Sequence, residues 1–324
     1  MPDSGPARDE DVLQAVRAAA PEAASGLVRA VRLPGGASRE TWLLHREDAE
    51  PLVLRLNTPG SLDPQALLRE GALIRTARAG GVPSPEVHAQ GRGPGPLSDG
   101  FVLMEHLPGE AVPQRILRDP ALADVRRRLP ADCGRILARI HDLDVAALEA
   151  ETDLSAVDQL DEWSGLLRAD PEPHPILEHV SAWLRRHRPE LVPPRLVHGD
   201  FRLGNLLVDP GGIRGVLDWE LAHLGDPAED LAWLTIRAWR FGRPEEVAGC
   251  GAVDDLVQAY TSAGGSPVEP DRLRWWQVMG CFRWGVICLH QGGRHLSGAE
   301  RSVELAAVGR RVAEAEYDAM LLLT

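Results

Sequence analysis

The stretch "LVHGDFRLGNLLVD", residues 196–209, places polar residues between two short apolar runs. Leu196 and Val197 predict one buried strand, and residues 206–208 predict another. The loop between them carries an acid, Asp200, and an amide, Asn205, five positions later. Loops fixed by flanking strands are where catalytic and binding residues concentrate. We therefore expect the chemistry of this chain in this loop.

A second carboxylate follows in "GVLDWE", where Asp218 comes thirteen residues after Asn205 and directly after an apolar pair. Carboxylate and amide oxygens suit Mg²⁺, which prefers one or two carboxylates together with water and substrate phosphates. Phosphoryl transfer also needs a carboxylate that accepts or orients the acceptor hydroxyl. H-G-D alone is weak evidence, but H-G-D-x-x-x-x-N followed by a later Asp predicts a phosphoryl-transfer site.

Composition narrows the class of protein. The 324 residues are 44% hydrophobic and 26% charged, which is typical of globular proteins. The net charge of −13 disfavours binding to nucleic acids or anionic membranes. An apolar run of about 18 residues is absent, and the acidic N-terminus does not resemble a signal peptide. The four cysteines are scattered, so we expect a cytoplasmic protein without a zinc site. The absence of lysine excludes Schiff-base chemistry.

Hydrophobic periodicity predicts an α+β protein with two lobes. A β-rich lobe over residues 1–107 would contain a short helix over 9–20 and strands over 27–33, 40–45 and 51–57. It would continue with a helix from a cap at Asp63 to residue 79 and strands in "VPSPEVHAQ" and "FVLMEHL". A larger, mainly helical lobe would follow over 108–324. Its predicted helices cover about residues 114–147, 155–188, 227–240, 251–263, 270–292 and 299–322.

These motifs resemble those of the aminoglycoside phosphotransferase and choline kinase family, which has a protein-kinase-like fold. "HGDFRLGN" is similar to the catalytic loop of that family and "VLDWE" to its metal-binding segment, and the resemblance covers nearly the whole chain in order. It implies that Asp200 is the catalytic base or hydroxyl-orienting residue. It also implies that Asn205 and Asp218 hold Mg²⁺, and that ATP is the phosphoryl donor.

The β-rich lobe offers candidate nucleotide contacts. Gly36, Ala37 and Ser38 lie in a Gly-rich turn between two predicted strands, where main-chain amides can approach phosphate oxygens. The resemblance places Arg55 where a basic residue contacts ATP phosphates. Glu70 falls on the apolar face of its predicted helix. Because a buried acid needs a partner, we expect Glu70 to pair with Arg55.

The segment "FVLMEHLPGE" resembles the hinge between the two lobes of the family. The resemblance implies that Met104 walls the adenine pocket. It also implies that the carbonyl of Glu105 and the amide of Leu107 bond the purine edge.

Several polar residues are better explained as structural. We expect His198 to pack under the catalytic loop, His141 to be structural, and Asp230 to brace the loop rather than ligate metal. Asp226 and Glu229 in "GDPAED" predict a capping box at the start of a helix.

The acceptor is less well determined. "CFRWGVICLHQGGRHLSG", residues 281–298, is similar to a bacterial subgroup related to the kinase domain fused to some acyl-CoA dehydrogenases. That relation implies a hydroxyacyl-CoA-like acceptor, with Arg283, Arg294 and His295 as candidates to meet anionic groups. The alternative is an aminoglycoside, for which acidic candidates are Asp158, Asp161, Glu162, Asp170 and Glu172.

Other classes of function remain open at this point. A nucleotide-binding pseudokinase regulator is the main alternative, although the chain has Asp200, Asn205 and Asp218. A metal-dependent hydrolase is remote because H-E-x-x-H and G-x-S-x-G motifs are absent. We expect a small hydroxylated substrate as partner, no nucleic acid or membrane, and a monomer or homodimer. The pattern leaves the acceptor and the choice between ATP and GTP undecided.

Overall fold

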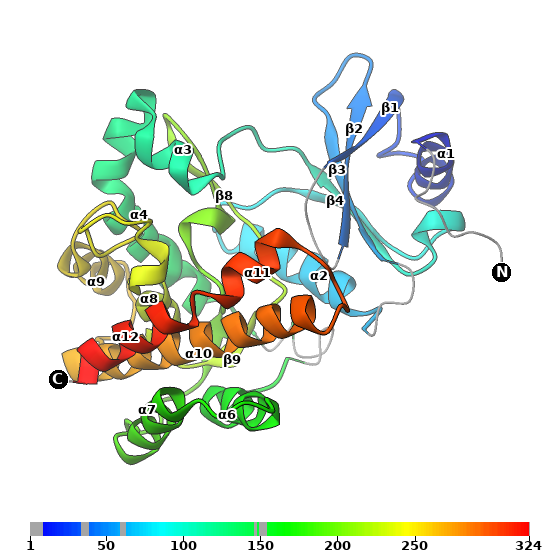
Figure 1. Cartoon of the computed structure of the whole chain (residues 1–324). Helices are drawn as coiled ribbons and strands as arrows, with labels where there is room; N and C mark the ends of the chain where they lie inside the picture. Colours follow the sequence, from blue (N-terminus) through cyan, green and yellow to red (C-terminus); the bar gives the residue numbers. More distant parts are fainter. Residues whose placement is uncertain (1–8, 34–38, 59–62, 146–147, 149–153, 324) are drawn as a thin grey trace. The chain divides into compact units, whose positions relative to one another are not determined.

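The computed structural model describes residues 9–33, 39–58, 63–145, 148 and 154–323 (Figure 1). The chain divides into two compact units: Met1–Gly109 with Leu143–Asp153 and Arg214–Glu220, and Glu110–Asp142 with Leu154–Ile213 and Leu221–Thr324. The continuous part of the first unit ends two residues beyond the boundary expected at residue 107. The assignment of residues 1–107 and 108–324 to separate functional lobes stays a prediction.

The first unit contains an antiparallel five-stranded sheet in the order β1-β2-β3-β5-β4 (Figure 1). The strands are β1 (Leu27–Leu33), β2 (Arg39–Arg46), β3 (Leu52–Asn57), β4 (Val87–Gly91) and β5 (Phe101–Glu105). Its two longer helices are α1 (Asp9–Ala19) and α2 (Ala66–Ala79). This is the β-rich part that the alternating apolar residues predict.

Successive side chains of β3 lie on opposite faces of the sheet. Leu52, Leu54 and Leu56 are buried and share a core with the apolar residues of α1. Successive strand residues point to opposite faces, so Arg55 lies on the other face. Helix α2 contacts β3, β4 and β5, and it supplies the acid that pairs with Arg55. The helix begins at Ala66 rather than beside Asp63, whose side chain accepts a hydrogen bond from the Gln65 amide.

The second unit is mainly helical in its described part. Its helices are α3 (Pro113–Arg118), α4 (Ala123–His141), α6 (Gln159–Ala169), α7 (Pro175–Arg186), α8 (Ala228–Trp233), α9 (Val253–Ser262), α10 (Pro270–Leu296), α11 (Val303–Gly309) and α12 (Val312–Leu323). Helix α10 contacts α7, α8, α11 and α12, and it contributes Trp275, Val278 and Phe282 to their shared core. Figure 1 shows α11 and α12 running along α10.

Short strands frame the predicted catalytic loop. Strands β6 (Arg195–Val197) and β9 (His223–Gly225) pair antiparallel, and β7 (Leu206–Asp209) and β8 (Gly212–Val216) form another two-stranded sheet. The loop thus has a strand on each side, as its sequence predicts. Among the described helices, none is both long and apolar enough to cross a membrane.

Several predicted helices were too long. The helix expected over 114–147 is two helices, because Asp119 has an extended backbone and begins a 3₁₀ turn at Pro120. A proline disfavours the helical conformation in the residue that precedes it. The helix expected over 155–188 likewise divides into α6 and α7 at the Pro-rich stretch around residues 170–175. The helices expected over 227–240 and 299–322 are also interrupted.

Candidate active site

Three donors hold the carboxylate of Asp200. The Nδ2 of Asn205 donates to Oδ2 at 2.7 Å and to the Asp200 carbonyl at 2.9 Å. The indole Nε1 of Trp233 donates to Oδ1 at 2.8 Å. The Nε of Arg202 donates to both carboxylate oxygens at 3.1 Å. The Asp200 side chain is only 15% exposed, so its position is fixed by these bonds and not by solvent.

A buried acid braces the main chain of the same loop. Asp230 is fully buried, and it accepts the amide of His198 at 2.7 Å and that of Gly199 at 2.9 Å. His141 Nε2 lies 3.2 Å from Asp230, and Tyr260 hydrogen-bonds the other ring nitrogen of His141. Burial would raise the pKa of Asp230, but the bonds from His141 and the amide of His198 lower it below its usual value. These contacts confirm the bracing role predicted for Asp230. The side chain of His198 is also fully buried, and its Nδ1 accepts the amide of Asp200 at 3.3 Å, which agrees with the structural roles predicted for both histidines.

Gly199 makes the turn of the loop. Its φ is +76°, a left-handed conformation that suits glycine. A Cβ at this position would lie 2.3 Å from the carbonyl oxygen of Leu221. The glycine of H-G-D is therefore required by both conformation and space.

In the first unit, Glu70 joins two arginines. Glu70 is 1% exposed, and its two carboxylate oxygens form ion pairs with Arg55 and Arg39. The pair predicted between Glu70 and Arg55 is confirmed. Arg39 was not predicted, although its place in the sequence directly after "PGGAS", at the start of β2, was a usable signal. Burial lowers the pKa of both guanidinium groups.

Asp218, also in the first unit, has a strained backbone and an incompletely satisfied carboxylate. Its φ is +64°, which is uncommon outside glycine. Its Oδ1 is buried and makes no hydrogen bond within the described part of the chain, although Arg55 Nη2 lies 3.8 Å away. A buried carboxylate oxygen in this state is suited to a cation.

The chemistry of Asn205 in the second unit is also compatible with a metal ligand. Its amide nitrogen is committed to Asp200, so its amide oxygen is the atom that can ligate. The described residues contain no group of three or more His, Cys, Asp and Glu side chains arranged for a metal. An amide oxygen can ligate Mg²⁺ together with water and substrate phosphates.

The remaining residues predicted to contact the nucleotide lie partly inside and partly outside the described part of the chain. Gly36, Ala37 and Ser38 lie outside the described residues. Met104 and Glu105 end β5, and Met104 is 5% exposed. The Glu105 side chain accepts hydrogen bonds from Arg78 and the Glu86 amide. Leu107 follows the strand and is half-buried.

Two contacts of Asp200 were missed by the sequence analysis. Trp233 lies 33 positions later on α8, a separation that no local pattern can bridge. Arg202 lies inside the motif itself, so its spacing of two residues from Asp200 was a usable signal.

The capping box was only partly right. Asp226 accepts a bond from the Ala228 amide as predicted, but Glu229 turns to His223 and Arg283 instead of completing the box. The Glu229 carboxylate therefore bonds these buried partners and does not cap the helix.

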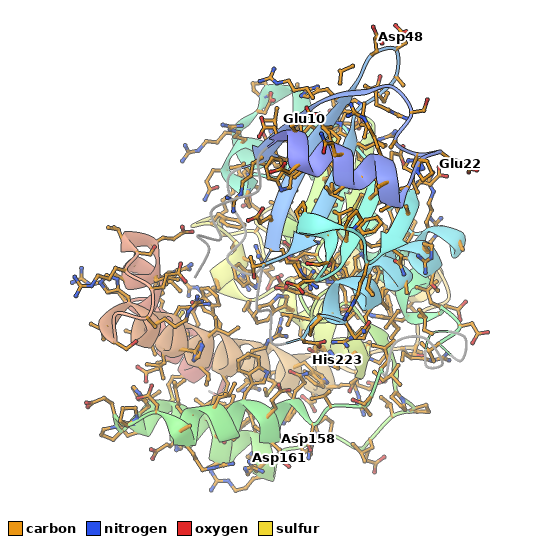
Figure 2. All side chains as sticks on the ribbon, turned by 90° about the vertical axis from the view of Figure 1, so that its right-hand side faces the viewer. Glu10, Glu22, Asp48, Asp158, Asp161 and His223 are labelled. Carbon is orange, nitrogen blue, oxygen red and sulfur yellow. The ribbon has the colours of Figure 1, made fainter. Side chains whose placement is uncertain are left out.

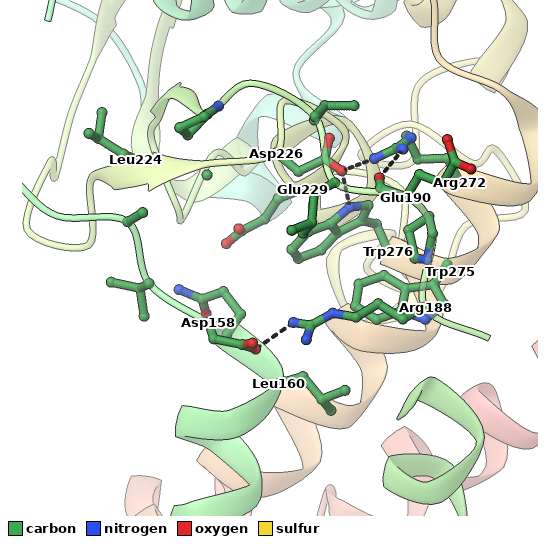
Figure 3. A pocket seen from close by; sticks show the side chains of 18 residues that line it. Asp158, Leu160, Arg188, Glu190, Leu224, Asp226, Glu229, Arg272, Trp275 and Trp276 are labelled. Carbon is green, nitrogen blue, oxygen red and sulfur yellow. Dashed lines mark hydrogen bonds and ion pairs between the residues drawn. The ribbon is translucent and has the colours of Figure 1, made fainter. Parts of the chain in front are cut away.

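The acids considered for a cationic acceptor are partly neutralised. Asp158 and Asp161, at the start of α6, form ion pairs with Arg188 and Arg185 (Figure 2). Arg188 holds the pKa of Asp158 below its usual value. Asp158 and Arg188 line a pocket of about 380 Å³ in the second unit, and Figure 3 shows the bond between them. This pocket therefore presents few unpaired acids to a polycation.

A family comparison matches most of the chain. The model of the "Phosphotransferase enzyme family" matches residues 29–276. This range includes the catalytic loop, Asp218, Arg55 and Glu70.

Relatives in sequence are parts of longer proteins. The chain is 28% identical over 309 residues to acyl-CoA dehydrogenase family member 10 of Mus musculus, covering 88% of this chain and 28% of that protein. It is 29% identical over 289 residues to acyl-CoA dehydrogenase family member 11 of Homo sapiens, covering 82% of this chain and 36% of that protein. The chain thus spans about a third of the length of these relatives.

Solved structures share the fold. A putative aminoglycoside phosphotransferase from Ralstonia eutropha superposes with a TM-score of 0.75 at 21% identity, covering 97% of each chain. An aminoglycoside phosphotransferase in complex with GDP and kanamycin gives a TM-score of 0.68 at 16% identity, covering 95% of this chain and 98% of the other. These likenesses establish the protein-kinase-like phosphotransferase fold.

Proposed function

This chain belongs to the phosphotransferase enzyme family. From that premise, we propose that it transfers the γ-phosphoryl group of ATP, with Mg²⁺, to a hydroxyl group of a small molecule. The observation that carries the proposal is the Asp200 carboxylate, held by Asn205, Trp233 and Arg202 on a loop braced by Asp230. Phosphoryl transfer depends mainly on positioning and on electrostatic stabilisation. A rigidly placed carboxylate meets the first need.

Each residue has a proposed role. Asp200 orients the acceptor hydroxyl and accepts its proton as the oxygen attacks phosphorus. Asn205 and Asp218 hold Mg²⁺, which when bound would neutralise charge on the phosphates. The Oδ1 of Asp218, which makes no hydrogen bond within the described residues, supports this role. The Nδ2 of Asn205 donates to Asp200, which leaves the amide oxygen as its ligating atom. The chain between these two residues is the short hairpin of β7 and β8.

The nucleotide contacts are part of the same proposal. Arg55 contacts the phosphates, and Glu70 orients its guanidinium through their ion pair. Main-chain amides of Gly36, Ala37 and Ser38 cover the phosphates. Met104 walls the adenine pocket, and the main chain of Glu105 and Leu107 bonds the purine edge.

For the acceptor, we propose a hydroxylated acyl-CoA-like compound. The support is the match to proteins named as acyl-CoA dehydrogenase family members, over a segment that covers most of this chain. An aminoglycoside is the alternative, supported by likeness in fold to aminoglycoside phosphotransferases. The pairing of Asp158 and Asp161 with arginines favours the first candidate.

The test incubates the protein with Mg²⁺ and ATP and a pooled library of hydroxylated metabolites, antibiotics and acyl-CoAs, and identifies phosphorylated products by mass spectrometry. Asp200→Asn removes the negative charge and an oxygen acceptor, and should abolish product. The matched control, Asp254→Asn, changes an exposed acid in the first turn of α9 and should retain full activity. ATP binding without any product in the wild type would instead identify a pseudokinase regulator.

We further propose a cytoplasmic location. All four cysteines, Cys133, Cys250, Cys281 and Cys288, are free thiols. Proteins without disulfides are typical of reducing compartments.

A further inference from the structure

A basic pocket in the second unit is not used by the roles assigned above. It has a volume of about 890 Å³, within the range of small-molecule sites. Four arginines and two acids are among its lining residues: Arg237, Arg240, Arg243 and Arg311, with Glu314 and Asp318. Four positive against two negative side chains make the pocket basic, although the whole chain carries a net charge of −13.

Within the described residues, two of these arginines form no ion pair with a carboxylate. Arg237 pairs with Asp318 and Arg311 pairs with Glu314. Arg240 instead donates to the main-chain carbonyl of Thr235, and Arg243 donates to that of Gly249. Their positive charges are therefore oriented by main-chain bonds and left for an anion.

Aromatic contacts join this pocket to the catalytic loop. The guanidinium of Arg202, which bonds Asp200, lies 4.9 Å from the ring centre of Trp239. The rings of Trp239 and Trp284 are 4.8 Å apart, and Trp284 lines the pocket. Gln114, another lining residue, follows Pro113, whose ring lies 3.7 Å from the position of a Cβ at Gly204 in the loop. The pocket and Asp200 thus belong to one packed assembly.

Hydrogen-bond donors without a partner among the described residues also support an anionic ligand. The Nε1 of Trp284 is buried and has no hydrogen-bond partner within the described residues, and the same holds for the Nε1 of Trp239, whose ring packs against that of Trp284. Both atoms are donors. A ligand rich in acceptor oxygens would satisfy donors of this kind, and Trp284 lies directly in the pocket wall.

The backbone beside the pocket is also strained. In the described part of the chain, the non-glycine residues with positive φ are Asp218, Phe241 and Ala248. Phe241 lines the pocket, and Ala248 lies in the same segment between Trp239 and α9. Such strain concentrates at functional sites because packing must maintain it.

From these observations we propose that this pocket binds the anionic end of an elongated acceptor whose hydroxyl lies at Asp200. The chemical class is a hydroxylated phosphate ester or carboxylate. The assignment of the hydroxyl end depends on the proposed function, whereas the anion site itself does not. A polycationic acceptor would meet like charge in this pocket.

The test uses four probes with the same six-carbon chain and a hydroxyl at one end, which differ in the group at the other end: 6-hydroxyhexyl phosphate, 6-hydroxyhexanoate, 1,6-hexanediol and 6-amino-1-hexanol. Binding is measured by calorimetry on the full chain saturated with Mg²⁺ and ADP, so that the probes do not occupy the nucleotide site. The anionic probes should bind at least about tenfold more tightly than the diol and the amine, as expected for charge-assisted hydrogen bonds. Preference for the phosphate or for the carboxylate probe identifies the source of the anion.

Variants then locate the site. Arg243→Gln should weaken binding of the preferred anion by about ten- to a hundredfold, and Arg243→Lys should restore much of it because the charge returns. Arg311→Gln provides a second test that leaves the main-chain bond of Arg243 intact. Arg185→Gln, on an exposed face of α7, is the matched control and should have no effect.

The outcomes separate this inference from the proposed function. Anion binding that is lost in Arg243→Gln, without phosphoryl transfer to any compound, would support the anion site while refuting the kinase. Phosphoryl transfer to a cationic acceptor, with no preference for anionic probes, would support the kinase and refute the anion site. Folded Arg243→Gln and Arg311→Gln variants that both bind the anion as tightly as the wild type would also overturn it.

Discussion

Replacing Asp230 with asparagine tests whether the catalytic loop depends on a buried brace. Oδ2 of Asp230 accepts the amide of His198 at 2.7 Å and lies 3.2 Å from His141, while Oδ1 accepts the amide of Gly199 at 2.9 Å. Asparagine offers only one oxygen. One main-chain donor therefore loses its acceptor and faces an NH₂ group instead. The change is nearly isosteric, so packing is preserved while one contact is inverted.

The magnitude follows from the energetics of buried hydrogen bonds. Leaving a buried donor unsatisfied costs about 1–3 kcal/mol, and a bond to a charged acceptor contributes about 1.5–3 kcal/mol. Because the two contributions overlap in part, they are not simply added, and we expect the free energy of local opening of the loop to fall by about 2–4 kcal/mol. At about 1.4 kcal/mol per tenfold change, local opening becomes roughly 30- to 1000-fold more frequent.

Hydrogen exchange measures this change without knowledge of the acceptor. Exchange of the amides of residues 196–206 should accelerate by that factor in Asp230→Asn, while exchange in strand β3 should stay unchanged. Tyr260→Phe is the matched control because it removes a hydroxyl that contacts His141 and not the loop. If the loop of a folded Asp230→Asn protein exchanged within threefold of the wild-type rate, the brace would not be what stabilises it.

Three further predictions concern buried charges and backbone. Glu70→Gln leaves two partly buried guanidinium groups without their carboxylate and should lower the free energy of unfolding by about 3–5 kcal/mol. Arg69→Gln removes one partner of an exposed ion pair and should change that free energy by less than about 1 kcal/mol. Equal effects of the two substitutions in urea titrations would contradict the prediction. Gly199→Ala should cost at least about 1–3 kcal/mol in thermal unfolding because its φ is +76°, and an unchanged melting temperature would disagree. Burial lowers the pKa of His223, but the carboxylate of Glu229 outweighs burial and raises this pKa above 6.5, so the stabilisation by their ion pair is complete below pH 6.5 and is lost as pH rises through the folded-state pKa. His223→Gln should remove this part of the pH dependence of the free energy of unfolding. Parallel plots of that free energy against pH for the two proteins would refute the prediction.

Local sequence was sufficient to predict parts of the site that depend on short-range chemistry. The polar residues from His198 to Asn205, set between two apolar runs, predicted a loop between two strands. The structure shows that Asp200 and Asn205, five residues apart, bond each other in this loop. The helical position of Glu70 predicted a buried acid, and a buried acid requires a cation, which Arg55 supplies. Arg39, the second cation of this cluster, was missed because nothing in the pattern measures how many partners a carboxylate accepts.

Helix ends were predicted less well than helix faces. Apolar periodicity correctly identified α10, whose buried side contacts several other helices. It failed at Asp119 and at the Pro-rich stretch before α7, where local turn chemistry interrupts a continuing apolar pattern. At Glu229 the error was of another kind. The local pattern predicted a helix cap, but the side chain instead makes tertiary contacts with His223 and Arg283.

The sequence by itself predicted the reaction class, because Asp200, Asn205 and Asp218 occur at a spacing typical of phosphoryl transfer and follow strands that the apolar pattern predicts. Only the tertiary structure decided what holds these groups. Trp233 reaches Asp200 across 33 residues, Asp230 reaches the loop amides across about 30, and arginines from separate segments gather in one basic pocket. Hydrogen bonds and ion pairs act over about 3–4 Å in space, whatever the separation along the chain, and that distance is set by folding.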